Sequence, residues 1–169
     1  DSNRVDTRRC DDQFSFLNQT HAFGSIEQIN WNYSAFGKLW TYNLNYFDFI
    51  RQNPPGHCGK KTSGIAQLLI EDWITKSPII KAGHEPYPTS LRIMNWLGFY
   101  EENNILPPDW VVAAVRIKYL DLWGKLEYHL QGNHLLENAI ALVRAAYYFN
   151  DHQRLPKALR LLRTQLQEQ

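Results

Sequence analysis

Three stretches of the chain combine aromatic rings with amide and charged side chains, a mixture that suits binding of sugar rings. They cover residues 40–48 (WTYNLNYFD), 84–96 (HEPYPTSLRIMNW) and 132–138 (GNHLLEN). Each lies in an expected loop or at an expected helix start, where functional residues concentrate. Large aromatic residues also fill cores and interfaces, so both roles are open for any single ring.

The pair Asn133 and His134 has the clearest chemical use. An Asn that follows a glycine at a helix start is an ordinary N-cap. Backbone N–H groups and the helix dipole also favour an anion at that place, such as a carboxylate, and both roles can hold together. Glu137 and Asn138 follow one helical turn later, so we expect them to orient the pair.

Other polar residues of these stretches have weaker signals. The guanidinium of Arg92 can bind a carboxylate in a forked geometry, but pairing with an Asp or Glu inside the fold is the competing interpretation. His84 and Glu85 are adjacent without the spacing of a zinc site, so no metal site is expected. The chain has no GxSxG elbow, P-loop or dinucleotide fingerprint, which argues against those enzyme classes.

Composition limits the class of protein. A chain of 169 residues with 44% hydrophobic and 21% charged residues is typical of one globular domain. Its 18 basic and 17 acidic residues give a formal charge of +1, which disfavours nucleic acid as a partner. No apolar run approaches the roughly 20 residues of a membrane span, and the start shows no signal-peptide core, so we expect a soluble or already processed chain. Cys10 and Cys58 allow one disulfide, which the sequence leaves undecided.

The elements that position these stretches are expected to be helices. Residues 1–64 predict an irregular segment packed on the helices, with a short strand around Phe14 and Phe16. Apolar residues at helical spacing in 65–169 predict helices at about 65–76, from an N-cap at Ser90 towards Tyr100, 109–130, 135–149 and 155–166. The fold class expected is all-α, an incomplete α/α toroid of antiparallel hairpins, although no sequence repeat is visible.

In order and spacing, the three stretches resemble the amino-terminal toroid domain of the heparinase II/III family of polysaccharide lyases. The resemblance covers about residues 36–149 and is closest in residues 128–138 (YHLQGNHLLEN). It implies β-elimination on a uronic-acid polysaccharide, with Asn133 and His134 neutralising the uronate carboxylate as charge develops. It further implies no cofactor, an acidic polysaccharide or oligosaccharide as partner, and a periplasmic or secreted location.

The resemblance also places further residues around the cleft, some as substrate contacts and others as braces. These are Trp40, Asn43, Tyr46, Tyr87, Arg92, Asn95, Trp96, Glu137 and Asn138. Stacking of a sugar on Trp40 or Tyr87 is a hypothesis. The family's acid and base, a Tyr and a Tyr or His, lie farther along a chain that continues through more hairpins into a β-sandwich.

Nothing that matches that acid and base follows Asn150, and Tyr147 and Tyr148 have the spacing of packing residues. The chain is therefore expected to be a truncated and inactive part of a lyase. We expect its last hairpin to expose apolar positions such as Val143, Ala146 or Leu159, or to self-associate through them. The alternatives are a non-catalytic glycan-binding or scaffolding domain, and a helical interaction module without a sugar ligand.

Overall fold

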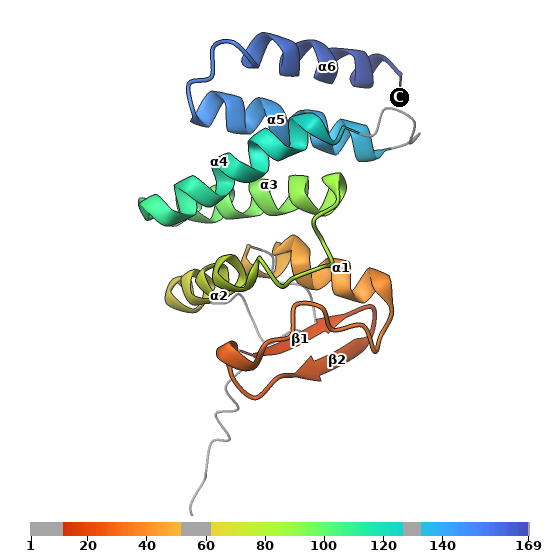
Figure 1. Ribbon diagram of the computed structural model, residues 1–169, viewed down its shortest axis with the longest axis vertical. Coiled ribbons are helices and arrows are strands. Elements are labelled where there is room, and N and C mark those ends of the chain that lie inside the picture. Colours follow the sequence, from red (N-terminus) through yellow and green to blue (C-terminus); the bar gives the residue numbers. More distant parts are fainter. Residues whose placement is uncertain (1–11, 52–61, 127–132, 169) are drawn as a thin grey trace, which may run out of the picture.

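The computed structural model describes residues 12–51, 62–126 and 133–168. A small antiparallel hairpin opens this part of the chain, and six α-helices follow within the described ranges (Figure 1). The prediction of a mainly helical protein is confirmed. The elements are β1 (Gln13–Phe16), β2 (Gln19–Ala22), the 3-10 helices η1 (Ile26–Gln28) and η2 (Asp48–Ile50), α1 (Lys38–Tyr46), α2 (Ser63–Lys76), α3 (Pro86–Glu102), α4 (Asp109–Gly124), α5 (Asn133–Tyr148) and α6 (Leu155–Gln167).

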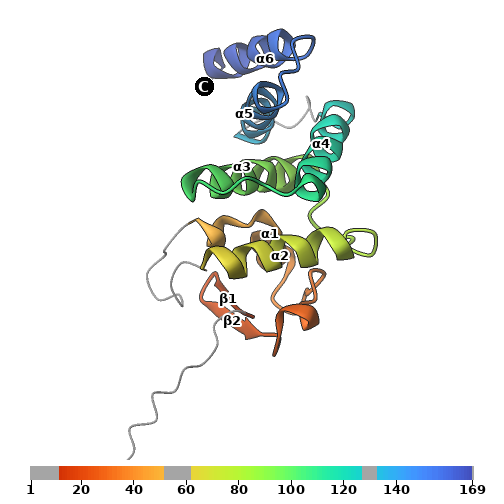
Figure 2. The same cartoon turned by 90° about the vertical axis from the view of Figure 1, so that its left-hand side faces the viewer.

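The elements are stacked along one long axis. The hairpin lies at one end beside α1 and α2, α3 and α4 occupy the middle, and α5 and α6 form the other end (Figures 1 and 2). α3 is the central element, because it contacts α1, α4 and α5, whereas α6 packs mainly on α5. Helix α3 therefore connects the two ends of the described structure by direct packing.

Helices α3 and α5 run in the same direction. Contacts between the two helices follow the same order in each, from the first turn to the last. Tyr87 contacts His134, Ser90 contacts Asn138, and Glu101 forms an ion pair with Arg144. α4 follows α3 and precedes α5 in the chain, lies beside both helices and contacts each of them (Figures 1 and 2). As a result, the first turns of α3 and α5 lie side by side.

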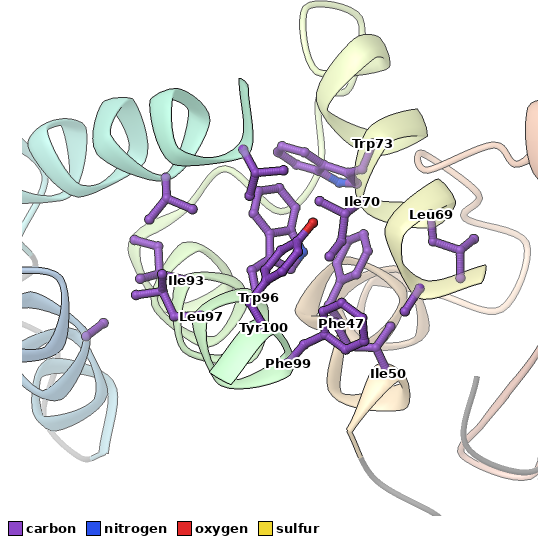
Figure 3. Close-up of a cluster of buried hydrophobic side chains, with 14 of the residues drawn as sticks. Phe47, Ile50, Leu69, Ile70, Trp73, Ile93, Trp96, Leu97, Phe99 and Tyr100 are labelled. Atoms are coloured by element: carbon purple, nitrogen blue, oxygen red, sulfur yellow. The ribbon is translucent and has the colours of Figure 1, made fainter. Parts of the chain in front are cut away.

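Aromatic rings from several elements fill the core (Figure 3). The indole of Trp96 meets Phe47 edge to face with 5.3 Å between centroids, and it meets Trp73 at 5.5 Å. Trp31, Trp40, Trp73 and Trp96 are all almost fully buried. Such rings bury large areas and favour tilted geometry, so much of the aromatic content serves packing.

Within the first 64 residues, the described ranges 12–51 and 62–64 contain regular elements. The predicted strand is present as β1, but the helix α1 was not predicted from the sequence. Its buried positions include the polar residues Thr41 and Asn45, which interrupt the apolar pattern. The Asn45 amide donates to Trp31 O at 3.0 Å and accepts from Trp73 Nε1 at 2.8 Å, so its burial is compensated.

Two predicted helix boundaries were wrong. Ser90 is not an N-cap: α3 begins at Pro86, and the hydroxyl of Ser90 donates back to Pro86 O. A proline fits the first turn because its missing N–H would have no partner there. The helix that starts at Asp109 ends at Gly124 and does not extend towards Leu130. Leu130, Gly132, Cys10 and Cys58 lie outside the described residues.

None of the described helices is both long and apolar enough to span a lipid bilayer.

Candidate functional site

One ring from each of the three stretches contributes to a continuous row. Tyr46 at the end of α1 meets Tyr87 edge to face, with 5.8 Å between centroids and 84° between planes. Tyr87 stacks on His134 at 4.3 Å and 22°. We call Tyr46, Tyr87 and His134 the ring row. It crosses three helices that the sequence separates by up to 88 positions (134 − 46).

Two helix N-termini meet at the ring row. The first turns of α3 and α5 contain no acidic residue, and Asn133 and His134 are exposed there. The dipoles of both parallel helices contribute positive partial charge at this place, but Pro86 and Pro88 supply no N–H to the first turn of α3, and the ionised Glu85 is its N-cap. The dipole of a second helix therefore points towards Asn133 and His134, and anion binding at these residues stays a prediction.

Carboxylates also lie beside the ring row. Burial raises the pKa of Asp48, opposed by a hydrogen bond from Asn95 and by the charge of Arg51. Burial and the charge of Asp48 raise the pKa of Glu137. Both groups therefore take up a proton more readily than ordinary carboxylates, and their ionised forms oppose an anionic ligand.

Glu85 behaves differently from these two carboxylates. Burial acts to raise its pKa, but a hydrogen bond from the Tyr42 hydroxyl at 2.5 Å, its backbone bonds and the charge of Lys38 outweigh that effect. The pKa of Glu85 is therefore lowered, and this side chain is a fixed negative charge in the neutral range.

The two tyrosines of the row keep their protons. Burial raises the pKa of Tyr46, and the nearby Tyr87 hydroxyl adds to the effect. Burial and the charges of Glu137 and Asp48 raise the pKa of Tyr87. Both hydroxyls are protonated at neutral pH and cannot act as a base there, and because Tyr46 is only 8% exposed, Tyr87 and His134 form the accessible part of the row.

Arg92 and Asn95 brace α1 rather than face a ligand. Arg92 Nη1 donates to Asn45 O at 3.0 Å and to Gly83 O at 2.9 Å, and Asn95 Nδ2 donates to Tyr46 O at 2.9 Å. The last carbonyls of a helix have no intrahelical donor. Arg92 and Asn95 supply donors to the last two carbonyls of α1.

The interpretation of Arg92 as a carboxylate-binding residue was wrong, whereas a structural role inside the fold is confirmed, with partners among the described residues other than the expected Asp or Glu. Only 1% of the residue is exposed, so a substrate carboxylate cannot reach it. Its partners are backbone carbonyls and Thr89, and its guanidinium lies 3.9 Å from the centre of the Trp73 ring. Burial lowers the pKa of Arg92 to about 9, so the group is still charged at neutral pH.

Asn138 joins the first turns of α3 and α5. The side chain is fully buried, and with its amide nitrogen turned towards α3 it donates to Ser90 Oγ at 2.7 Å and to Pro86 O at 3.2 Å. Asn138 therefore holds the helix start that carries His134 against the one that carries Tyr87, and it does not face a ligand.

Three further predicted contact residues lie away from the ring row or inside the core. Trp40 is fully buried and donates through Nε1 to Gln19 O at 3.0 Å, so the hypothesis of a sugar stacked on it was wrong. Trp96 is buried in the aromatic core. Asn43 is partly exposed and donates to Leu39 O within α1 at 2.8 Å.

Sequence reasoning did not select Tyr42, Asp48 or Glu85, although all three lie within the first two stretches. A usable signal for Tyr42 is its i, i+4 spacing to Tyr46, which places both rings on one side of α1. For Asp48 and Glu85 the signal is only a carboxylate next to a ring-rich run, and such residues are usually surface groups.

The predicted exposed face of the last hairpin is partly present. Val143 and Leu159 line an apolar groove between α3, α5 and α6, whereas Ala146 is fully buried. Tyr147 was expected to pack but is 77% exposed at this groove, and Tyr148 packs against the core as expected.

No protein-family model, curated protein or solved structure matches this chain.

Proposed function

We propose that the ring row binds a uronic-acid glycan and that the chain is the helical-toroid part of a polysaccharide lyase acting by β-elimination. The observation that carries the proposal is the stack of Tyr87 on His134 at the joined N-termini of α3 and α5. It combines the accessible rings of Tyr87 and His134 with the dipoles of two helix N-termini, features that suit a sugar ring and its carboxylate.

In this proposal Asn133 and His134 hydrogen-bond the uronate carboxylate. A base then removes the proton on the adjacent carbon, and charge moves into the carboxylate as the carbanion forms. Asn133 and His134 already donate to the carboxylate oxygens, so they stabilise the developing charge without reorganisation. The proposal assigns neither the base nor the acid that protonates the leaving oxygen to a residue of this chain, so binding is the property to test first.

A second candidate function is non-catalytic binding of a neutral glycan. It is favoured by Asp48, Glu85 and Glu137, because their carboxylates suit sugar hydroxyl donors and oppose an anion. The two candidates differ in the charge of their ligand, which can be tested directly.

The test is a calorimetric titration of the chain with uronic-acid oligosaccharides and with neutral oligosaccharides of equal length. A double variant, Asn133→Ala with His134→Ala, removes the proposed carboxylate ligands. A control variant, His152→Ala with Gln153→Ala, changes two exposed residues just beyond the other end of α5.

Preferential binding of uronates that only the first variant loses supports the carboxylate site. Preferential binding of neutral sugars supports the second candidate. Absence of affinity for either ligand class contradicts both candidate functions. The remaining alternative is then a helical interaction module without a sugar ligand. Cleavage itself is tested by the ultraviolet absorbance of unsaturated uronate, with the downstream lyase segments supplied.

A further inference from the structure

Lys118 lies at a junction of three elements that the proposed function does not use. It projects from α4, and its Nζ is 3.1 Å from Nδ1 of His84, in the loop before α3. The same Nζ is 5.4 Å from the centre of the Trp73 ring on α2. The amine is thus held between an imidazole and an indole.

No carboxylate of the described residues forms an ion pair with Lys118. The nearest opposing charge, Asp121, is already bonded to Lys125 at 2.8 Å. The guanidinium of Arg92 lies over the Trp73 ring and adds a second positive charge to the same junction. The ammonium form of Lys118 is therefore opposed by burial and by positive neighbours, while the Trp73 ring, the His84 imidazole and Asp121 compensate its charge only in part.

The pKa values of Lys118 and His84 are both lowered, as expected from this geometry. Burial, followed by the charge of Arg92, lowers the pKa of Lys118 to about 8, with Lys125 acting in the same direction and Asp121 against it. Burial and the charges of Lys118 and Arg92 lower the pKa of His84, while a hydrogen bond to the backbone of Ile80 opposes this. A neutral imidazole is then available as a hydrogen-bond acceptor.

We propose that Lys118 is a nucleophilic amine and a site of covalent modification by small aldehydes. In the neutral amine, one N–H donates to His84 Nδ1, and this fixes the orientation of the nitrogen lone pair. The side chain is partly exposed, so a small reagent reaches it. Desolvated lysines of this kind serve as amine nucleophiles in proteins.

The reaction is a condensation. The Nζ lone pair forms a bond to the carbonyl carbon, the π electrons move to oxygen, and the proton lost by nitrogen passes through His84 Nδ1 or water to that oxygen. The resulting hemiaminal loses its hydroxyl with a proton as water, which leaves a C=N imine. No oxidant or reductant is required for this step.

The experiment treats the folded chain with glycolaldehyde and cyanoborohydride at pH 7.5, where cyanoborohydride supplies the hydride that traps the imine as a secondary amine. Mass spectrometry of peptides then gives the early rate at Lys118 relative to Lys157, an exposed lysine on α6. We expect Lys118 to react at least about tenfold faster, because burial and the charge of Arg92 lower its pKa and favour the neutral amine. A rate equal to or below that of Lys157 overturns the proposal.

Two variants test the electrostatic cause. Lys125→Gln removes a positive neighbour and releases Asp121, so the rate at Lys118 should fall while that at Lys157 is unchanged. Asp121→Asn removes the attracting charge, so the rate at Lys118 should rise. The Lys125 side chain is 52% exposed and that of Asp121 is 39% exposed, and the fold should tolerate both changes. A rate at Lys118 that neither substitution alters contradicts the assignment of its reactivity to these charges.

Discussion

The imidazole of His134 lies nearly parallel to the phenol ring of Tyr87, with 4.3 Å between the ring centres and 22° between the planes. Each residue directly follows the first residue of its helix, Pro86 in α3 and Asn133 in α5. The stack therefore sets the position of an exposed histidine relative to two helix N-termini. Removing the tyrosine ring should disturb that position without touching the histidine.

Tyr87→Ala should weaken binding of a uronic-acid oligosaccharide by about tenfold, close to the ~0.5–1.5 kcal/mol of an aromatic pair plus a lost sugar contact. Tyr87→Phe preserves the stack and should bind almost as well as the unmodified chain. Titration calorimetry measures both, with thermal unfolding as a check on the fold. If Tyr87→Phe is as weak as Tyr87→Ala, the hydroxyl rather than the stack is responsible.

Uronate binding should strengthen as the pH falls from neutral towards 5. Asp48 and Glu137 have raised pKa values, so each gains its proton earlier on acidification than an ordinary carboxylate and ceases to repel the ligand. Glu85 has a lowered pKa and stays ionised over more of this range. The measurement is the dissociation constant as a function of pH.

Glu137→Gln isolates the contribution of one carboxyl to this dependence. The variant should bind uronate more tightly than the unmodified chain at pH 7, with a smaller gain on acidification, because its side chain is neutral throughout. An unchanged pH profile would show that Glu137 does not act on the ligand. Neutral oligosaccharides should show little dependence in either protein.

Most helices could be predicted from the sequence because they bury an apolar stripe. The periodicity in α2, α4, α5 and α6 follows from contact with a neighbouring helix on one side. In α1 the buried set includes Thr41 and Asn45, whose partners Tyr33, Trp31 and Trp73 are distant in sequence. Such a helix has no signal that a local pattern can detect.

The candidate site could be predicted in part, because its rings lie in stretches with an unusual local composition. Composition selected the stretches that contain Tyr87 and His134, and the structure brings those rings together. Composition could not separate a ligand-facing Asn or Arg from a buried one. Arg92 and Asn95 look like recognition residues in sequence, but their partners are carbonyls of α1, a helix that was itself not predicted.

Asn138→Ala should destabilise the folded chain by about 1–3 kcal/mol, because it leaves buried polar groups of α3 without their partner. Asn133→Ala changes an exposed residue of the same helix and should alter stability by no more than about 0.5 kcal/mol. Urea unfolding followed by tryptophan fluorescence measures both. Equal effects would argue against Asn138 as the residue that joins the two helix starts.

Gly83→Ala should lower the stability of the fold considerably, although it adds only one methyl group. Gly83 has a φ of +76°, and an added Cβ would lie 2.6 Å from the Cβ of Asn45. The strain would shift Asn45, which bonds Trp31 and Trp73, and would move the Gly83 carbonyl away from Arg92. We expect a loss of about 2 kcal/mol or more in the free energy of unfolding.

Gly124→Ala is the matched control for Gly83→Ala. Gly124 ends α4, and an added Cβ there meets no atom within 4 Å. A methyl group at a compatible helical position reduces the entropy of the unfolded chain, so this variant should be neutral or gain up to about 1 kcal/mol. If both substitutions have the same effect, the close approach of Gly83 to Asn45 does not limit stability. A large difference is the result expected from the positive φ of Gly83 together with its close approach to Asn45.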